Sequence, residues 1–468
     1  MARLKPLSGF PEFLPSGQMV ENHVTRILEE TFELHGFAPI HTRAVEPMRQ
    51  LTRKGEIDKE VYVVDRLHAD PHDSRSEKDC LGLHFDLTVP FARYVLENAG
   101  HLYFPFRRYQ IQKVWRGERP QEGRYREFTQ ADIDIVGDQT LAEHHDVETP
   151  LVMLSALERL HTELGFPTVT MHVNNRKLSE GFYRGLGIED PMAVLQRVDK
   201  YDKIGPDAVR ELLVDELSLS DDVAAKCVAL ASIQSSDDSF IAKVRELGVT
   251  NEMLEEGLDS LNRVVAAVNK AVPGRMVANL KIARGLDYYT GTVYETELTG
   301  HESMGSVCSG GRYESLASDG KHVYPGVGIS LGLTRLLAPI LSRGELSSSR
   351  SVPSAVLVAV NTEEDRVTSE AVAQALRSRG IPCEVAPKAD KFGKQIKHAD
   401  RRGIPYVWFP GVEHTDRRDA DTVKDIRSGD QVEADAASWN PPTEDLYPGV
   451  IGTWWSVSHR GLARGRAY

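Results

Sequence analysis

The sequence predicts an α+β protein whose core is an antiparallel sheet flanked by helices. Two predicted strands, residues 106 to 115 and 126 to 136, are joined by a charged loop with glycine and proline, which is the pattern of a hairpin. Residues 175 to 273 are acidic and helix-rich, with short polar joints. Residues 354 to 440 follow the order β-α-β-α-β, which predicts a second, largely parallel sheet.

Length and composition narrow the class of protein. A chain of 468 residues exceeds one ordinary core, so we expect several domains. The four cysteines lie far apart without a CxxC pair, which predicts neither a zinc site nor a disulfide framework. The N-terminus has no apolar signal segment, and no apolar run approaches the length of a membrane span. We therefore expect a cytoplasmic protein without a membrane partner.

The hairpin carries the polar residues of a candidate site. Alternation in its second strand places four side chains on one face, namely Phe128, Gln130, Asp132 and Asp134. Four guanidinium groups, which bind carboxylates and phosphates, surround the loop: Arg116, Arg119, Arg124 and Arg126. Cations beside carboxylates suit a zwitterion next to a polyphosphate. On spacing alone, a charged hairpin with a solvated face remains the simpler interpretation.

A second candidate lies in residues 83 to 95. Asp86 and Thr88 are two residues apart, so we expect both on one strand face just before Pro90 begins a helix. A carboxylate and a hydroxyl are acceptors for an ammonium group. The alternative is that one of them only caps the helix.

Four strings resemble one family. Residues 116 to 137, RGERPQEGRYREFTQADIDIVG, closely resemble motif 2 of the class II aminoacyl-tRNA synthetases, specifically the histidyl-tRNA synthetases. RGLDYYTGTVYE, at 284 to 295, is nearly the whole signature of the histidyl family. SVCSGGRYESL, at 306 to 316, resembles its second histidine motif, and GVGISLGLTRLL, at 326 to 337, resembles motif 3. The resemblance covers about residues 8 to 440.

The resemblance implies a class II synthetase-like fold with a helical insertion and a C-terminal α/β anticodon-binding domain. Residues 17 to 35 show a helical apolar stripe and resemble part of motif 1, which implies a homodimer, although a core helix within one chain is the alternative. The implied boundaries are a catalytic core at 1–174 and 274–343, an insertion at 175–273, a linker at 344–353, an anticodon-binding domain at 354–440 and an unassigned tail at 441–468.

The resemblance also implies a reaction. The carboxylate of histidine attacks the α-phosphate of ATP to form histidyl-adenylate and pyrophosphate, and the histidyl group then passes to tRNA(His). ATP is a substrate, and Mg²⁺ is held mainly through its phosphates. No protein metal site is expected, because His144 and His145 are adjacent, point differently and look like surface residues.

Site residues follow from the same resemblance. The catalytic cations would be Arg116 and Arg284. Histidine would be bound by Asp86, Thr88 and Gln130 at its amino end, by Asp134 and Tyr289 at its imidazole, and also by Tyr288 and Tyr313. ATP would be bound by Arg116, by Arg124 and Arg335 at the distal phosphates, by Phe128 stacking on adenine against Arg335, and by Glu118 at the exocyclic amine.

A basic stripe is predicted on the helix at 391 to 402. Its cations recur every three or four residues: Lys388, Lys391, Lys394, Lys397 and Arg401. Such a stripe can follow an RNA backbone, or it can be a solvated helix face. The net charge of −13 argues against a general nucleic-acid binder but allows a local basic surface.

Two other functions deserve comparison. The synthetase-like regulatory subunit of ATP phosphoribosyltransferase resembles the core, but it usually lacks the anticodon domain and degrades the arginines and the RGLDYY string present here. A regulatory domain of a larger kinase is disfavoured because no kinase sequence is attached.

Overall fold

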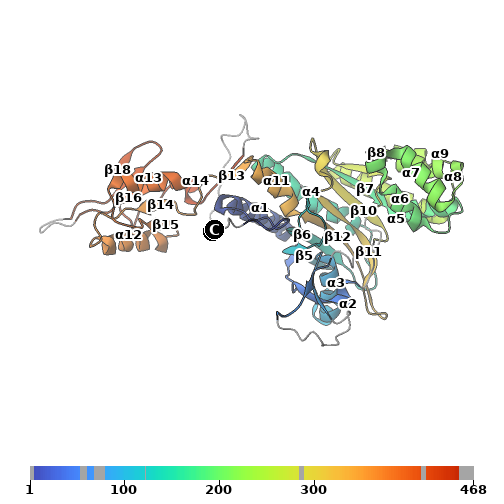
Figure 1. The fold of residues 1–468 in the computed structure, drawn as a ribbon, viewed down its shortest axis with the longest axis horizontal. Coiled ribbons are helices and arrows are strands. Elements are labelled where there is room, and N and C mark those ends of the chain that lie inside the picture. Colours follow the sequence, from blue (N-terminus) through green and yellow to red (C-terminus); the bar gives the residue numbers. More distant parts are fainter. Residues whose placement is uncertain are drawn as a thin grey trace. The chain divides into compact units, whose positions relative to one another are not determined.

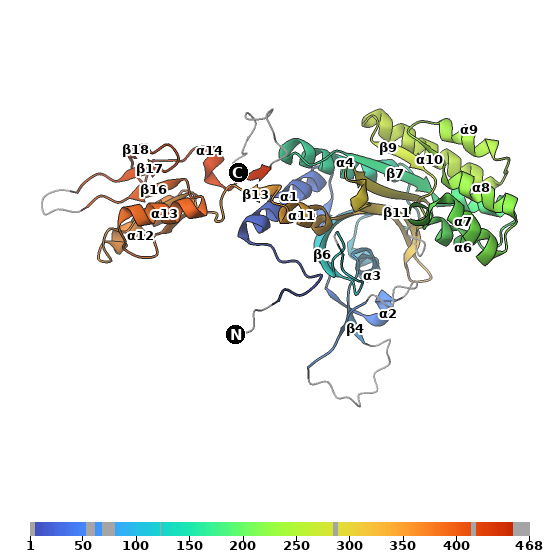
Figure 2. The ribbon, with the colours of Figure 1, turned by 45° about the horizontal axis from the view of Figure 1, so that its top comes forward.

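The computed structural model describes residues 5–52, 61–67, 80–121, 123–283, 289–412 and 418–452. The chain forms two compact units, which are shown in Figures 1 and 2. The large unit comprises Met1–Pro11 and Thr25–Pro339, and the small unit comprises Glu12–Val24 and Ile340–Tyr468.

A nine-stranded sheet forms the centre of the described part of the large unit. In spatial order its strands are β1 (Ala38–Pro39), β5 (Phe106–Trp115), β6 (Glu127–Val136), β12 (Val323–Gly332), β11 (Cys308–Ser318), β10 (Thr292–Leu298), β7 (Val169–Asn175), β9 (Met276–Asn279) and β8 (Gln234–Ser235). Pairing is antiparallel except at β1–β5 and β7–β9. The predicted hairpin is β5–β6, and the predicted α+β class is confirmed.

Helices cover this sheet and support its polar centre. Helices α3 (Thr88–Asn98) and α4 (His145–Leu164) contact its strands, and α11 (Leu333–Ser342) directly follows β12. Phe91 and Val95 of α3 are buried in one apolar cluster with Val136 of β6 and Tyr313 of β11. The cluster fixes α3 against the sheet, so residues near the start of α3 lie beside β6 and β11. A three-stranded sheet, β2 (Val45–Pro47), β4 (Leu81–Leu83) and β3 (Val63–Val64), adjoins α2 (Met48–Leu51).

Helix α1, Pro15–Leu34, contains the predicted apolar stripe. Its buried residues include Val20, Val24, Ile27 and Phe32. The helix is followed by Gly36, whose φ of +78° is readily adopted only by glycine.

The acidic sequence from 176 to 271 is helical, as its composition predicts. Its helices are α5 (Arg176–Gly185), α6 (Pro191–Val198), α7 (Tyr201–Leu217), α8 (Asp221–Ala231), α9 (Ser239–Glu246) and α10 (Glu252–Ala271). They gather beside β7 and β10 in Figure 1, and α10 and α5 contact β7. Gly181 of α5 and Gly257 of α10 allow the two helices to touch. A Cβ on Gly181 would lie 2.3 Å from the backbone nitrogen of Leu254, and one on Gly257 would lie 2.2 Å from that of Leu178.

The small unit holds a five-stranded sheet in the order β15 (Cys383–Val385), β14 (Val356–Val358), β16 (Tyr406–Phe409), β17 (Thr422–Asp425), β18 (Gln431–Glu433). The three predicted strands are parallel, whereas β17 and β18 are antiparallel additions that the sequence did not indicate. Helices α12 (Arg366–Ser378) and α13 (Phe392–Arg402) pack on opposite faces of this sheet. Val356 of β14 is buried in one apolar cluster with residues of α12, and its neighbour Leu357 is buried in another with a residue of α13. The remaining elements are β13 (Leu346–Ser348), β19 (Val450–Gly452) and α14 (Thr443–Leu446).

In the described parts of the chain, no helix combines the length and the apolar character needed to cross a membrane.

Candidate functional site

Two adjoining pockets open on the large sheet. The first, which we call the acidic pocket, has a volume of about 420 Å³ and is lined by Asp86, Thr88, Arg116, Gln130, Asp132, Asp134, Tyr289, Ser309, Tyr313, Gly328, Ile329 and Ser330. The second, the arginine pocket, has about 830 Å³ and is lined by Arg116, Glu118, Gly123, Arg124, Tyr125, Phe128, Gln130, Ser306, Val307, Cys308, Ser309, Ser330, Gly332 and Arg335. They share a wall, because Arg116, Gln130, Ser309 and Ser330 line both.

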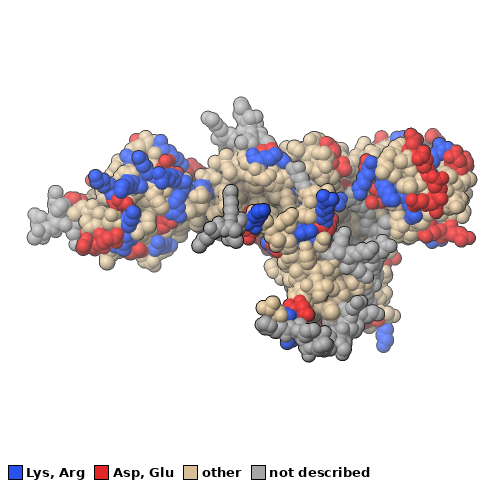
Figure 3. All heavy atoms as spheres, viewed as in Figure 1, with Lys and Arg blue, Asp and Glu red and all other residues tan. Residues whose placement is uncertain are grey.

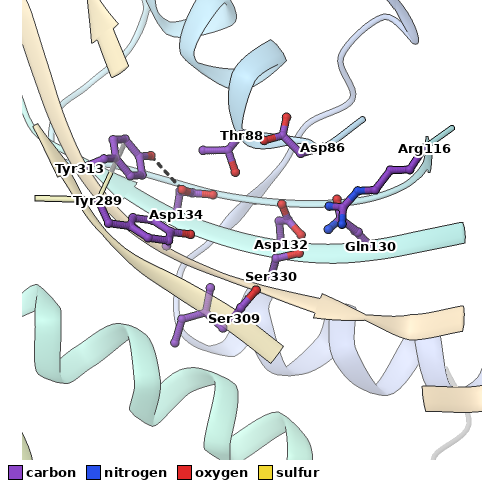
Figure 4. A pocket seen from close by; sticks show the side chains of 12 residues that line it. Asp86, Thr88, Arg116, Gln130, Asp132, Asp134, Tyr289, Ser309, Tyr313 and Ser330 are labelled. Atoms are coloured by element: carbon purple, nitrogen blue, oxygen red, sulfur yellow. Dashed lines mark hydrogen bonds between the residues drawn. The ribbon is translucent and has the colours of Figure 1, made fainter. Parts of the chain in front are cut away.

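Strand alternation and register build the acidic pocket. Figure 4 shows Gln130, Asp132 and Asp134 side by side along one strand, β6, as the alternation predicts. The neighbouring strand β12 contributes Ser330 opposite Asp132. Gly328 lies opposite Asp134, and a Cβ there would meet Asp134 Oδ1 at 2.1 Å. Glycine at this position therefore leaves room for the carboxylate.

Asp134 has two fixed partners. Arg108 Nη2 lies 2.5 Å from its Oδ2, and the Tyr313 hydroxyl donates to its Oδ1 at 2.8 Å. Burial raises the pKa of Asp134, while Arg108 and Tyr313 act in the opposite direction. Arg108 and Tyr313 together hold the Asp134 carboxylate in a defined orientation. Figure 4 shows Asp134 at the end of the pocket that Tyr289 and Tyr313 line.

The expected strand position of Asp86 and Thr88 is wrong. Strand β4 ends at Leu83, Asp86 lies in the following turn, and Thr88 is the first residue of α3. The reason is local, because Asp86 Oδ1 accepts from the backbone nitrogen of Val89 at 3.1 Å and so stabilises the first turn. Asp86 thus makes a helix-capping contact and also lines the pocket with Thr88. Burial raises its pKa to about 6.

Three polar side chains that line the acidic pocket had no predicted role: Asp132, Ser309 and Ser330. Asp132 is only 2% exposed, and burial raises its pKa to about 7. Strand alternation in the sequence placed Asp132 on the same face as Gln130 and Asp134, and this alternation could have identified Asp132 as a site residue. Ser309 comes from β11 and Ser330 from β12; β11 pairs with β12, and β12 pairs with β6, so segments far apart in the sequence meet here.

The arginine pocket brings together the predicted ATP residues. Arg116 Nε donates to the Phe85 carbonyl at 3.0 Å, and its guanidinium lies 5.0 Å from the centre of the Phe128 ring. Arg335, on α11, donates to the Met304 carbonyl. Glu118 and Arg124 line the same pocket, and their charged groups are 3.7 Å apart. In this structure the cation over Phe128 is therefore Arg116, whereas the sequence predicts Arg335 as the stacking partner when adenine is bound.

Two predicted site residues, Arg284 and Tyr288, lie outside the described residues. Tyr289, the next residue after Tyr288, lines the acidic pocket. The other predicted histidine and ATP residues line one or both pockets.

The expectation that both His144 and His145 are surface residues is wrong for His145. It begins α4 and is 3% exposed, and its Nδ1 lies 2.8 Å from Glu148 Oε2. His144, His145 and Glu148 could hold a metal ion by distance alone. However, Glu148 also pairs with Arg107, so a cation already occupies this carboxylate.

The predicted basic stripe belongs to the small unit. Lys391 is the N-cap residue of α13, and all five cations are exposed: Lys388, Lys391, Lys394, Lys397 and Arg401. Lys388 and Lys394 both pair with Asp390, at 3.4 and 2.9 Å. Figure 3 shows lysine and arginine side chains gathered on one face of this unit.

Comparisons with known proteins identify the family of the chain. The family model "Histidyl-tRNA synthetase" matches residues 9–336, and "Anticodon binding domain" matches residues 354–438. A histidine–tRNA ligase of Cutibacterium acnes is 95% identical over 97% of this chain and all of its own length, and one of Micrococcus luteus is 59% identical over 96% and 99%.

Solved structures show the same fold. A histidyl-tRNA synthetase from Nostoc sp. superposes with a TM-score of 0.79 at 33% identity, covering 93% of this chain and 98% of its own. A Bacillus halodurans protein titled as an ATP phosphoribosyltransferase regulatory subunit/histidyl-tRNA synthetase reaches 0.69 at 19% identity, covering 85% and 97%, which supports the fold alone. The chain therefore belongs to the histidyl-tRNA synthetase family.

Proposed function

We propose that this aminoacyl-tRNA synthetase, a histidine–tRNA ligase, forms histidyl-adenylate where the acidic pocket meets the arginine pocket. The observation that carries the proposal is the wall shared by the two pockets, which includes Arg116 and Gln130. A zwitterion in one pocket and a polyphosphate in the other would bring a carboxylate and an α-phosphate together there. The regulatory-subunit alternative is not favoured, because relatives up to 95% identical are histidine–tRNA ligases.

The acidic pocket binds histidine in this proposal. Asp134, held by Arg108 and Tyr313, accepts from the imidazole, and Tyr289 lies at the same end. Asp86, Thr88 and Gln130 take the α-amino end. A neutral imidazole needs both a donor and an acceptor, so such a site discriminates strongly against side chains that lack either nitrogen.

The arginine pocket binds ATP. Its guanidinium groups suit phosphates, and Phe128 offers an aromatic face for adenine, with Arg335 on the other side. Mg²⁺ is bound mainly by the phosphates of ATP. The protein supplies no nucleophile, so its contribution is positioning and stabilisation of charge at the reacting phosphate by Arg116 and, from the family resemblance, Arg284.

Transfer to tRNA involves the small unit. The match to an anticodon-binding domain at 354–438 and the exposed stripe on α13 support a surface that binds the RNA backbone. We also propose a homodimer, from the resemblance of residues 17 to 35 to motif 1.

Two substitutions separate the pockets. Asp134→Asn should raise the KM for histidine by at least about tenfold and leave the KM for ATP nearly unchanged, because it removes a charged acceptor from the acidic pocket alone. Arg335→Ala should raise the KM for ATP and leave the KM for histidine nearly unchanged. Arg343→Ala, which removes an exposed guanidinium just after α11, is the matched control for Arg335. Pyrophosphate exchange at varied substrate concentrations measures both constants, and equal effects of both variants on both substrates would refute the two-pocket assignment.

A further inference from the structure

Three buried side-chain oxygen atoms in the acidic pocket have no hydrogen-bond partner among the described residues: the Ser330 hydroxyl, which can also donate, and two acceptor oxygens. The acceptors are Oδ1 of Asp132 and Oε1 of Gln130, on residues that are 2% and 8% exposed. An unpaired buried acceptor costs free energy, and an unpaired carboxylate costs more than an amide. Since both side chains line the pocket, a bound molecule with N–H donors would satisfy them.

The position of Asp132 identifies which part of the substrate it meets. Gln130, Asp132 and Asp134 follow one another on one face of β6, with about 7 Å between successive members of such a row. Figure 4 shows Asp132 in the middle of this row, with Asp134 toward the two tyrosines and Gln130 toward Arg116. In histidine the α-carbon lies between the imidazole and the carboxylate. Histidine is shorter than the whole row, so with its imidazole at Asp134 its α-carbon and α-ammonium lie near Asp132 in the middle, within reach of the longer Gln130 side chain.

The charges around the pocket support the same assignment. The described lining residues include three carboxyl groups, on Asp86, Asp132 and Asp134, and one guanidinium, on Arg116. Arg108 adds a second guanidinium beneath Asp134. One carboxyl group therefore exceeds the cations that face it, and an ammonium group on the substrate would balance the excess.

We infer that Asp132 is a substrate-binding residue that accepts a hydrogen bond from the α-ammonium of histidine, together with Gln130 Oε1 and Asp86. An ammonium has three N–H donors, and these three residues supply three acceptors. The inference rests on the proposed histidine site. It adds to that site a second carboxylate at the amino end, contributed by the sheet, whereas Asp86 comes from the segment before α3.

The protonation of Asp132 agrees with this role. Burial raises its pKa to about 7, Arg108 and the neighbouring Ser330 lower it, and Asp134 and Asp86 raise it again. An ammonium beside Asp132 favours the ionised form, so the substrate itself would complete the charge pair.

The test uses two inhibitors that differ only in the amino group: histidinol, and 3-(imidazol-4-yl)propan-1-ol, which lacks the amine. Inhibition constants are measured against histidine in pyrophosphate exchange with the full-length protein. Asp132→Ala should weaken histidinol by roughly 10- to 100-fold, the range for a hydrogen bond to a charged group, and weaken the amine-free alcohol by less than about threefold. Asp132→Asn, which keeps the volume and removes the charge, should weaken histidinol by at least about tenfold.

Several controls keep the outcomes separate. Asp138→Asn removes an exposed carboxyl group two residues after β6 and should leave both constants unchanged. Asp134→Asn should weaken both inhibitors, since both carry the imidazole. Equal weakening of the two inhibitors by the Asp132 variants, or no effect on histidinol, would overturn the inference. If Asp132→Ala fails to fold, Asp132→Asn decides alone. Failure of the proposed function would look different, because the wild-type protein would then show no histidine-dependent exchange.

Discussion

Arg108 and Asp134 form an ion pair beneath the acidic pocket, with 2.5 Å between Nη2 of Arg108 and Oδ2 of Asp134. The two residues lie directly opposite each other on β5 and β6, and their side chains are 0% and 4% exposed. The guanidinium also lies 4.3 Å from the centre of the Phe91 ring. The site thus includes a cation that no solvent reaches and that favours the ionised form of Asp134.

Removing this cation should harm both stability and histidine binding. Arg108→Met leaves the Asp134 carboxylate buried without its charge partner, which typically costs about 3–5 kcal/mol of unfolding free energy. It should also raise the KM for histidine, because Asp134 then favours its protonated form. Urea unfolding and exchange kinetics measure the two effects. Arg107→Met is the matched control. Arg107 is a partly exposed neighbour that pairs with Glu148, so its loss should lower the unfolding free energy by less than about 1 kcal/mol. Equal losses in the two variants would contradict the role of Arg108.

Asp132 should make the stability of the free protein depend on pH. Its folded pKa of about 7 lies above the ordinary 3.8, so the folded state binds more protons than the unfolded state between these values. Stability from this group therefore falls as pH rises through that window. Asp132→Asn cannot ionise, so its unfolding free energy relative to wild type should rise by on the order of 2 kcal/mol between pH 5 and pH 8. Urea unfolding at both pH values measures these free energies, with Asp138→Asn as the control. A difference between Asp132→Asn and wild type that is the same at both pH values would contradict the raised pKa of Asp132.

The sequence predicted most of this site because its signals are local. Alternation along one strand was sufficient to place Gln130, Asp132 and Asp134 on a single face, and three of the arginines that the motif resemblance named, Arg116, Arg124 and Arg335, line the arginine pocket. It failed at Asp86, where a helix-capping contact competes with strand extension over only a few residues. Ser330 was missed because its position depends on pairing with Asp132, 198 residues earlier, and nothing in either segment encodes that register.

The basic stripe on α13 should serve tRNA and not the chemical step. Lys391→Glu with Lys394→Glu should raise the KM for tRNA severalfold or more, with a weaker salt dependence, and leave pyrophosphate exchange unchanged, because phosphate contacts are lost. A glutamate at the start of α13 suits the helix dipole, so the fold should survive. The control reverses two other charges of the same unit, Arg377→Glu with Lys424→Glu. An unchanged KM for tRNA in the α13 variant at physiological salt would exclude a role of the stripe in tRNA binding.

Arg284 lies outside the described residues, and its role remains a prediction from the family resemblance. A guanidinium at the junction of histidine carboxylate and α-phosphate would act mainly in the transition state, so Arg284→Ala should slow adenylate formation by on the order of 100- to 1,000-fold. Arg284→Lys should recover only part of the rate, because lysine restores the charge without the planar fork. Single-turnover kinetics at saturating substrates measure this. A normal rate constant with weakened binding would make Arg284 a binding residue instead.

The most direct measurement of the central claim is amino-acid-dependent exchange between pyrophosphate and ATP, performed with each of the twenty amino acids. In the proposed site Asp134 accepts from an imidazole nitrogen, and the buried oxygens of Asp132 and Gln130 accept from an ammonium group. Histidine alone should therefore support rapid exchange, with the other amino acids slower by roughly 10,000-fold, because buried partners would remain unpaired. Robust exchange with another amino acid, or none with histidine, would contradict the assignment.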